Sequence, residues 1–304
     1  MIALFARFMN SHSLRMAAAL SLSASALLSA CGAGSTFEPL VPTRVVSFGD
    51  GMSDLGQSGN RYTVNDGTTN IWVAQLAASY GLTITASVNS GGLGFATGDA
   101  RVNVGSNPIS VQISTFLGSN TIAASDLLVV DAGIAELVAL AGVNPTDDAA
   151  LATAADLSGK ALGAQIKRLT AAGGKHVVIA NAPDLGKTPY GATRAAGLTA
   201  ATRAFNDGIK IALADVSSGV LLIDNEAYIN TIYFTPSTLG SGGIASTPAC
   251  STATAAVSLN CTPTTLSTGV TNYNLYLFAD DRYPTPAVHR LIGNNAYNNI
   301  KTRW

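Results

Sequence analysis

Continuous apolar runs alternate along the chain with longer stretches whose apolar residues recur at helical spacing. The runs that predict buried strands are residues 45–48, 82–88, 126–131, 176–180 and 220–224, with a shorter one at 276–278. The stretches that predict helices are residues 70–80, 133–140, 149–172, 198–217 and 286–299. Strands that alternate with helices predict an α/β fold, in which a parallel sheet is covered by helices on both faces.

Composition narrows this prediction to one main domain. The chain has 304 residues, of which 47% are hydrophobic and only 12% are charged, so it can bury a single large core. The formal net charge is −1, and no basic stripe is present that could neutralise phosphates. We therefore expect no nucleic-acid partner.

The first 30 residues have the organisation of a secretory signal. Arg7 and Arg15 precede the apolar run 16–28, which ends in Leu-Ser-Ala and Cys31. This ending resembles a bacterial lipobox, which implies cleavage before Cys31, lipidation of its thiol and attachment of an exported protein to the membrane of the cell envelope. Residues 31–43 would then be the lipidated Cys and a flexible tether, followed by one domain at 44–304. The alternative is an ordinary secretory signal in which Cys31 occurs by chance.

The two remaining cysteines lie in a segment that is too rich in Gly, Ser, Thr and Pro to belong to the core. We interpret residues 235–271 as a surface excursion and expect Cys250 and Cys261 to form a disulfide within it. Two Cys without a nearby His make a poor zinc site. No metal and no cofactor are expected.

The turn after the first apolar run carries the most specific motif. Gly49-Asp50-Gly51-Met52-Ser53-Asp54 resembles the Gly-Asp-Ser-x-Ser-Asp signature of the SGNH hydrolases, also called the GDSL lipase/esterase family. The resemblance implies a flavodoxin-like three-layer α/β/α sandwich. It also implies acyl transfer by a Ser nucleophile, a His base, an Asp that orients the His, and an oxyanion hole of backbone and Asn donors. Gly51 occupies the position of the nucleophile and lacks its hydroxyl group.

Three further stretches resemble the family. Residues 95–101 match Tyr-Ala-x-Gly-Gly-Ala-Arg, which implies that Gly98 is the oxyanion glycine, although Gly91, Gly92 and Gly94 lie close by. Residues 133–136 correspond to the family stretch Gly-x-Asn-Asp, and Ala135 stands at the position of its oxyanion Asn. Residues 280–285 resemble the family stretch Asp-x-x-His-Pro-Thr. Asp280 is retained there, and Tyr283 stands at the position of the His base.

These replacements lead to three hypotheses. The first is a catalytically inactive protein on the cell envelope, whose cleft is retained as a binding or interaction scaffold for an acyl-ester, lipid or glycan ligand. The second is an active carboxylic-ester hydrolase with a non-family nucleophile, for which Ser53 is the nearest candidate, although the family Ser there resembles a helix cap. The third is a purely structural protein. We interpret His289 as a structural residue of the last helix and not as a displaced base.

Overall fold

Four parallel strands form the central sheet of the computed structural model. They are β1 (Arg44–Phe48), β2 (Asp126–Asp131), β3 (Val177–Ala180) and β4 (Val220–Ile223), in this spatial order. The structure describes residues 39–68, 71–216, 218–251 and 258–304, and Leu40–Arg303 form one compact unit. The predicted signal segment and Cys31 lie outside the described residues.

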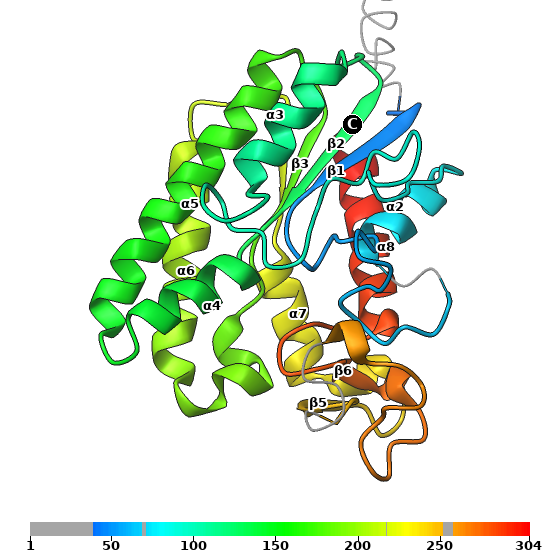
Figure 1. Cartoon of the computed structure of the whole chain (residues 1–304), viewed down its shortest axis with the longest axis vertical. Coiled ribbons are helices and arrows are strands. Elements are labelled where there is room, and N and C mark those ends of the chain that lie inside the picture. Colours follow the sequence, from blue (N-terminus) through cyan, green and yellow to red (C-terminus); the bar gives the residue numbers. More distant parts are fainter. Residues whose placement is uncertain (1–38, 69–70, 217, 252–257) are drawn as a thin grey trace, which may run out of the picture. The chain divides into compact units, whose positions relative to one another are not determined.

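Helices cover both faces of this sheet, which confirms the predicted three-layer α/β/α arrangement (Figure 1). On one face lie α3 (Ile109–Ser119), α4 (Ile134–Val143), α5 (Asp148–Ala171) and α6 (Ala195–Ala212). On the other face lie α2 (Trp72–Ser79) and α8 (Pro286–Arg303). Because side chains alternate along a strand, Val46 and Phe48 of β1 join the core on the α3 and α5 side, whereas Val45 points to the opposite face.

One predicted strand is wrong. Residues 82–88 form no strand, and Ala86 makes only an isolated bridge to Gly94. The outer edge of β1 pairs instead with residues 93–95, which follow in the chain. Ser47 N donates to Leu93 O (3.1 Å), and Phe95 N donates to Ser47 O (2.7 Å). The glycine-rich segment thus takes the edge position that a fifth parallel strand would occupy.

Two helices were not predicted. The pattern of α3 is weakened by Ser, Thr and Gln, and α7 (Asn225–Phe234) follows β4 so closely that Asp224 was assigned to the strand. Asp224 is instead the N-cap of α7, since its side chain accepts a hydrogen bond from Ala227 N at 3.0 Å.

A smaller region lies beyond the carboxyl ends of the sheet strands, around α7 (Figure 1). It contains the parallel pair β5 (Ile244–Pro248) and β6 (Tyr276–Phe278), and the disulfide between Cys250 and Cys261 is present there. The short 3-10 helices of the chain are η1 (Leu185–Lys187), η2 (Pro189–Thr193), η3 (Pro236–Leu239), η4 (Ser258–Asn260) and η5 (Tyr273–Leu275). None of the helices in the described ranges is long and apolar enough to cross a membrane.

Candidate functional site

The turn after β1 is fixed by the fully buried carboxylate of Asp50. Its Oδ1 accepts a hydrogen bond from Met52 N (3.0 Å), and its Oδ2 accepts from Gly133 N (3.2 Å) and Ala135 N (3.1 Å) at the start of α4. Burial raises the pKa of Asp50, and these backbone donors oppose the rise. The same contact therefore holds the turn and the amino end of α4 together.

Gly51, at the predicted nucleophile position, lies directly against Tyr283. A Cβ atom added to Gly51 would be 2.6 Å from the Tyr283 hydroxyl oxygen and 2.7 Å from its Cζ. The Tyr283 side chain is buried and packs against the ring of Tyr62, with ring centroids 4.9 Å apart. The phenol of Tyr283 therefore occupies the space that a nucleophilic side chain would need.

Gly98, the predicted oxyanion glycine, is covered by Tyr62, because a Cβ atom added to Gly98 would overlap the Tyr62 ring. Its backbone N–H donates to Asp54 Oδ2 at 2.8 Å and is thus already bound to a carboxylate. The next residue, Asp99, has φ 57°, a left-handed conformation that favours glycine, the residue type of the family at this position. Nothing in the local sequence pattern marked Tyr62, because it lies in an irregular loop.

Ala135 contributes only its backbone to this region, through the N–H that Asp50 accepts. The following residue, Glu136, is buried and accepts hydrogen bonds from Arg101 Nη2 (2.8 Å) and Val102 N (2.9 Å). Glu136 therefore anchors the segment after Gly98 to α4. No side-chain amide is available at position 135 to stabilise an oxyanion.

Asp280 is buried and binds backbone groups. Its Oδ1 accepts from Tyr283 N (2.6 Å) and Arg282 N (2.9 Å), and its Oδ2 accepts from Ser258 N (3.0 Å). Burial raises the pKa of Asp280, with these donors opposing the rise. The carboxylate that would orient a His in the family thus shapes the turn that carries Tyr283.

Ser53 lies in the core beneath the turn. Its Oγ accepts a hydrogen bond from Trp72 Nε1 at 3.0 Å, and its hydroxyl interacts with the buried carboxylate of Asp131. Burial and the nearby charge of Asp50 raise the pKa of Asp131 well above its usual range. Ser53 is therefore fully enclosed by neighbouring side chains.

His289 also lies in the core. Its Nδ1 accepts a hydrogen bond from Trp72 N at 3.3 Å, and complete burial lowers its pKa to about 3. This imidazole is neutral at physiological pH and has little affinity for a proton. The geometry agrees with a structural residue that joins α8 to α2.

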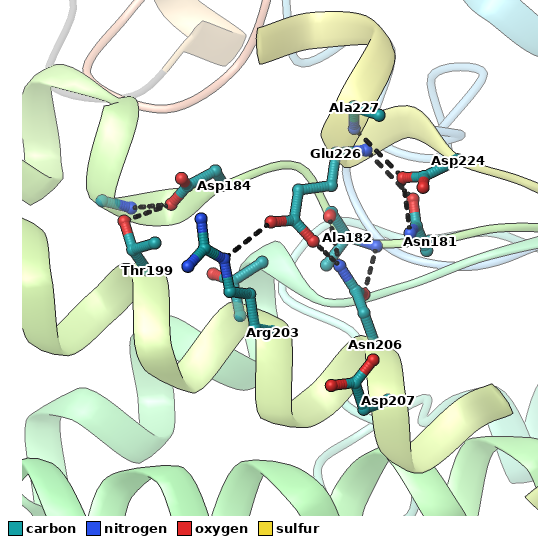
Figure 2. Close-up of polar contacts among 12 residues, drawn as sticks. Asn181, Ala182, Asp184, Thr199, Arg203, Asn206, Asp207, Asp224, Glu226 and Ala227 are labelled. Carbon is teal, nitrogen blue, oxygen red and sulfur yellow. Dashed lines mark hydrogen bonds and ion pairs between the residues drawn. The ribbon is translucent and has the colours of Figure 1, made fainter. Parts of the chain in front are cut away.

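A second polar cluster lies where β3 and β4 end (Figure 2). Asn181 donates to Asp224 Oδ1 (3.0 Å) and accepts from Glu226 N (3.0 Å). The side-chain amide of Asn206 in α6 donates to Glu226 Oε2 (2.9 Å) and to Ala182 O (3.0 Å), and its oxygen accepts from Ala182 N (3.0 Å). These contacts attach α6 and α7 to the strand ends. No group of His, Cys, Asp and Glu that could hold a metal ion is found among the described residues.

The contact between Gly51 and Tyr283 predicts strong coupling between these positions. Gly51→Ser alone should lower the free energy of unfolding by about 1–3 kcal/mol, because its side chain overlaps the Tyr283 ring. In a Tyr283→His background the same change should cost at least about 1 kcal/mol less. Urea denaturation of the four proteins measures the coupling. Gly118→Ser, at a helical position with no atom near the added Cβ, is the control. If Gly51→Ser lowers the free energy of unfolding equally with Tyr283 and with His at that position, the predicted overlap is contradicted.

The lowered pKa of His289 predicts a specific loss of stability in acid. In the unfolded chain the imidazole has its ordinary pKa and binds a proton below about pH 6.5. In the folded chain the same imidazole binds a proton only near pH 3. Stability from the neutral imidazole is thus present above pH 6.5 and falls as pH decreases. His289→Asn keeps an acceptor for Trp72 N but does not titrate. Between pH 6 and 4, the wild type should lose about 1 kcal/mol per pH unit relative to this variant. A pH-independent difference in urea denaturation would rule this out.

Comparison with known proteins relates the chain to one protein family and to solved structures. The family model described as GDSL-like Lipase/Acylhydrolase matches residues 45–296. Among solved structures, the chain is similar to a member of the lipolytic protein G-D-S-L family from Veillonella parvula DSM 2008, with 14% sequence identity, a TM-score of 0.50, and coverage of 86% of this chain and 98% of that one. This second likeness concerns the fold alone. No curated protein matches the chain. Since the family model spans most of the length of the chain, from β1 into the last helix, the chain belongs to the GDSL-like lipase/acylhydrolase family.

Proposed function

We propose that this chain keeps the GDSL fold without ester hydrolysis and serves as a binding or interaction scaffold. The observation that carries the proposal is the phenol of Tyr283 against Gly51, where the family has its nucleophile. In a well-studied triad enzyme, loss of the nucleophilic Ser costs about 10⁶ in turnover. Loss of one oxyanion donor, as at Ala135, costs about 10²–10³ more when such effects act separately.

Tyr283 does not replace the missing base. Burial raises its pKa well above its ordinary value, and the nearby carboxylates of Asp50 and Asp280 raise it further. The phenol is therefore protonated at neutral pH and cannot accept a proton from an attacking group. It also has no hydroxyl nucleophile to activate at position 51.

The rival proposal, an active hydrolase that uses Ser53, has less support. Ser53 is fully buried, and the indole of Trp72 donates to its Oγ. The one feature that favours this rival is the contact between the Ser53 hydroxyl and the buried carboxyl group of Asp131, whose pKa is raised well above its usual range. An ester carbonyl would nevertheless have to enter the core to reach Ser53.

Ester hydrolysis tests the proposal directly. Purified protein without residues 1–31 should hydrolyse p-nitrophenyl butyrate no faster than buffer does. The triple variant Gly51→Ser, Ala135→Asn, Tyr283→His should recover measurable turnover, because it restores the nucleophile, one oxyanion donor and the base. The matched control carries only Ala135→Asn and Tyr283→His and should stay inactive. Turnover by the natural protein that disappears in Ser53→Ala would contradict the proposal and support the rival.

The cleft in this proposal takes an acyl-ester, lipid or glycan ligand without cleaving it. Tyr62 and Tyr283 fill the space beside Gly98 and Gly51 and are themselves only 8% and 4% exposed, so the ligand would bind at the surface over these rings and not at the turn beneath them. Aromatic rings with a polar hydroxyl can pack against apolar chains and sugar rings alike. This arrangement supports recognition better than catalysis.

We also propose that the protein is exported and anchored to the bacterial cell envelope through Cys31, on the lipobox-like sequence that ends the signal segment. Cells that express the full chain should incorporate alkyne-tagged palmitate into it and retain it in the membrane fraction. Cys31→Ala should abolish both the label and the membrane retention. An unlabelled wild-type protein in the soluble exported fraction would instead indicate an ordinary secretory signal.

A further inference from the structure

The disulfide between Cys250 and Cys261 lies next to the turn that carries Tyr283. Both cysteines are buried and pack with Val64 and Ala279 in a small apolar cluster. Cys250 N donates to the backbone oxygen of Ala279 at 2.8 Å. One half of the disulfide is therefore attached to the residue that directly precedes Asp280.

The other half of the disulfide reaches Asp280 itself. Cys261 N donates to Ser258 O at 2.9 Å, and Ser258 N donates to Asp280 Oδ2 at 3.0 Å. The second oxygen of the same carboxylate accepts from Tyr283 N at 2.6 Å. The contacts thus form a closed ring through Cys250, Ala279, Asp280, Ser258 and Cys261, which the disulfide completes.

A parallel connection passes through the loop that carries Tyr62. The side-chain amide of Asn65 donates to Cys261 O (3.2 Å) and Ser258 O (3.3 Å). In the same loop, Thr63 Oγ1 donates to Pro284 O at 2.9 Å. Residues 258–261, at the second cysteine, therefore support the loop of Tyr62, and this loop in turn contacts the turn that carries Tyr283.

From this geometry we propose that the Cys250–Cys261 disulfide holds Tyr283 in the site, and that opening the disulfide exposes the space beside Gly51. Reduction by a dithiol breaks the S–S bond and yields two Cys thiols, while the dithiol gives up two electrons and two protons and becomes a disulfide. Ser258 is then joined to the β5–β6 region by the backbone and by hydrogen bonds but no longer by the cross-link, and Asp280 loses the fixed position of one donor. This device does not depend on whether the site hydrolyses esters.

Hydrogen exchange of the purified protein tests the proposal. In the double variant Cys250→Ser, Cys261→Ser, amides of residues 280–285 should exchange at least roughly tenfold faster than in the wild type, with those of β2 unchanged. Wild-type protein treated with dithiothreitol should reach the same rates once its disulfide is reduced. An equal acceleration in β2 would mean general destabilisation and would overturn the proposal, as would faster exchange confined to residues 258–271.

A second variant tests the route through Asp280. Asp280→Asn can keep its oxygen on Tyr283 N and Arg282 N, but it places an amide N–H group against Ser258 N, which is also a donor. In this background, removal of both cysteines should accelerate exchange of residues 280–285 by less than roughly threefold. Asn60→Ala, which removes only a contact with Leu259 O, is the matched control and should leave the full effect. The same tenfold acceleration in the Asp280→Asn background would show that the disulfide does not act through this carboxylate.

Discussion

The carboxylate of Asp50 is the contact on which the candidate site depends. This carboxylate is buried at the end of β1 and accepts hydrogen bonds from N–H groups of its own turn and of the start of α4. A buried carboxylate is tolerated only when donors surround it, so the turn and the helix start must keep their relative positions. This requirement is independent of catalysis. It allows the turn to keep its geometry with Gly51 at the position that the resemblance assigns to the nucleophile.

Two tyrosines fill the region in which the sequence predicts the site. Neither Gly51 nor Gly98 has a side chain, and Gly98 lies against the hydroxyl end of the Tyr62 ring. The site therefore has room for two aromatic rings that pack against each other. Burying large aromatic side chains is favourable, whereas an empty polar cleft contributes nothing to stability. The two rings belong to the packed interior, and the N–H groups of Gly98 and Ala135 bind Asp54 and Asp50.

Four buried or largely buried carboxylates connect this interior to the rest of the fold. Asp50, Asp54, Asp131 and Asp280 all have pKa values raised by burial. Three of them accept backbone N–H groups, and each joins segments that are distant in sequence, such as Ser258 and the turn at Tyr283 through Asp280. The disulfide region is therefore coupled to the site by direct hydrogen bonds, although it lies outside the main sheet.

The sequence alone predicted most of the strands and helices, and motif resemblance pointed to the turn after β1 and to Gly51, Ala135 and Tyr283 as the family positions of the nucleophile, the oxyanion Asn and the base. These features follow from local periodicity, turn residues and motif resemblance, which are properties of short segments. The misplaced edge strand at 82–88 and the missed helix α7 show the limit of local patterns, because edge pairing and helix capping depend on neighbouring segments. Only the tertiary structure decided that Tyr283 fills the space at Gly51, that Tyr62 covers Gly98, and that Asp54, 44 residues away, takes the Gly98 N–H. The physical reason is that packing and hydrogen bonding between distant segments depend on distances in space, which the chain order does not specify.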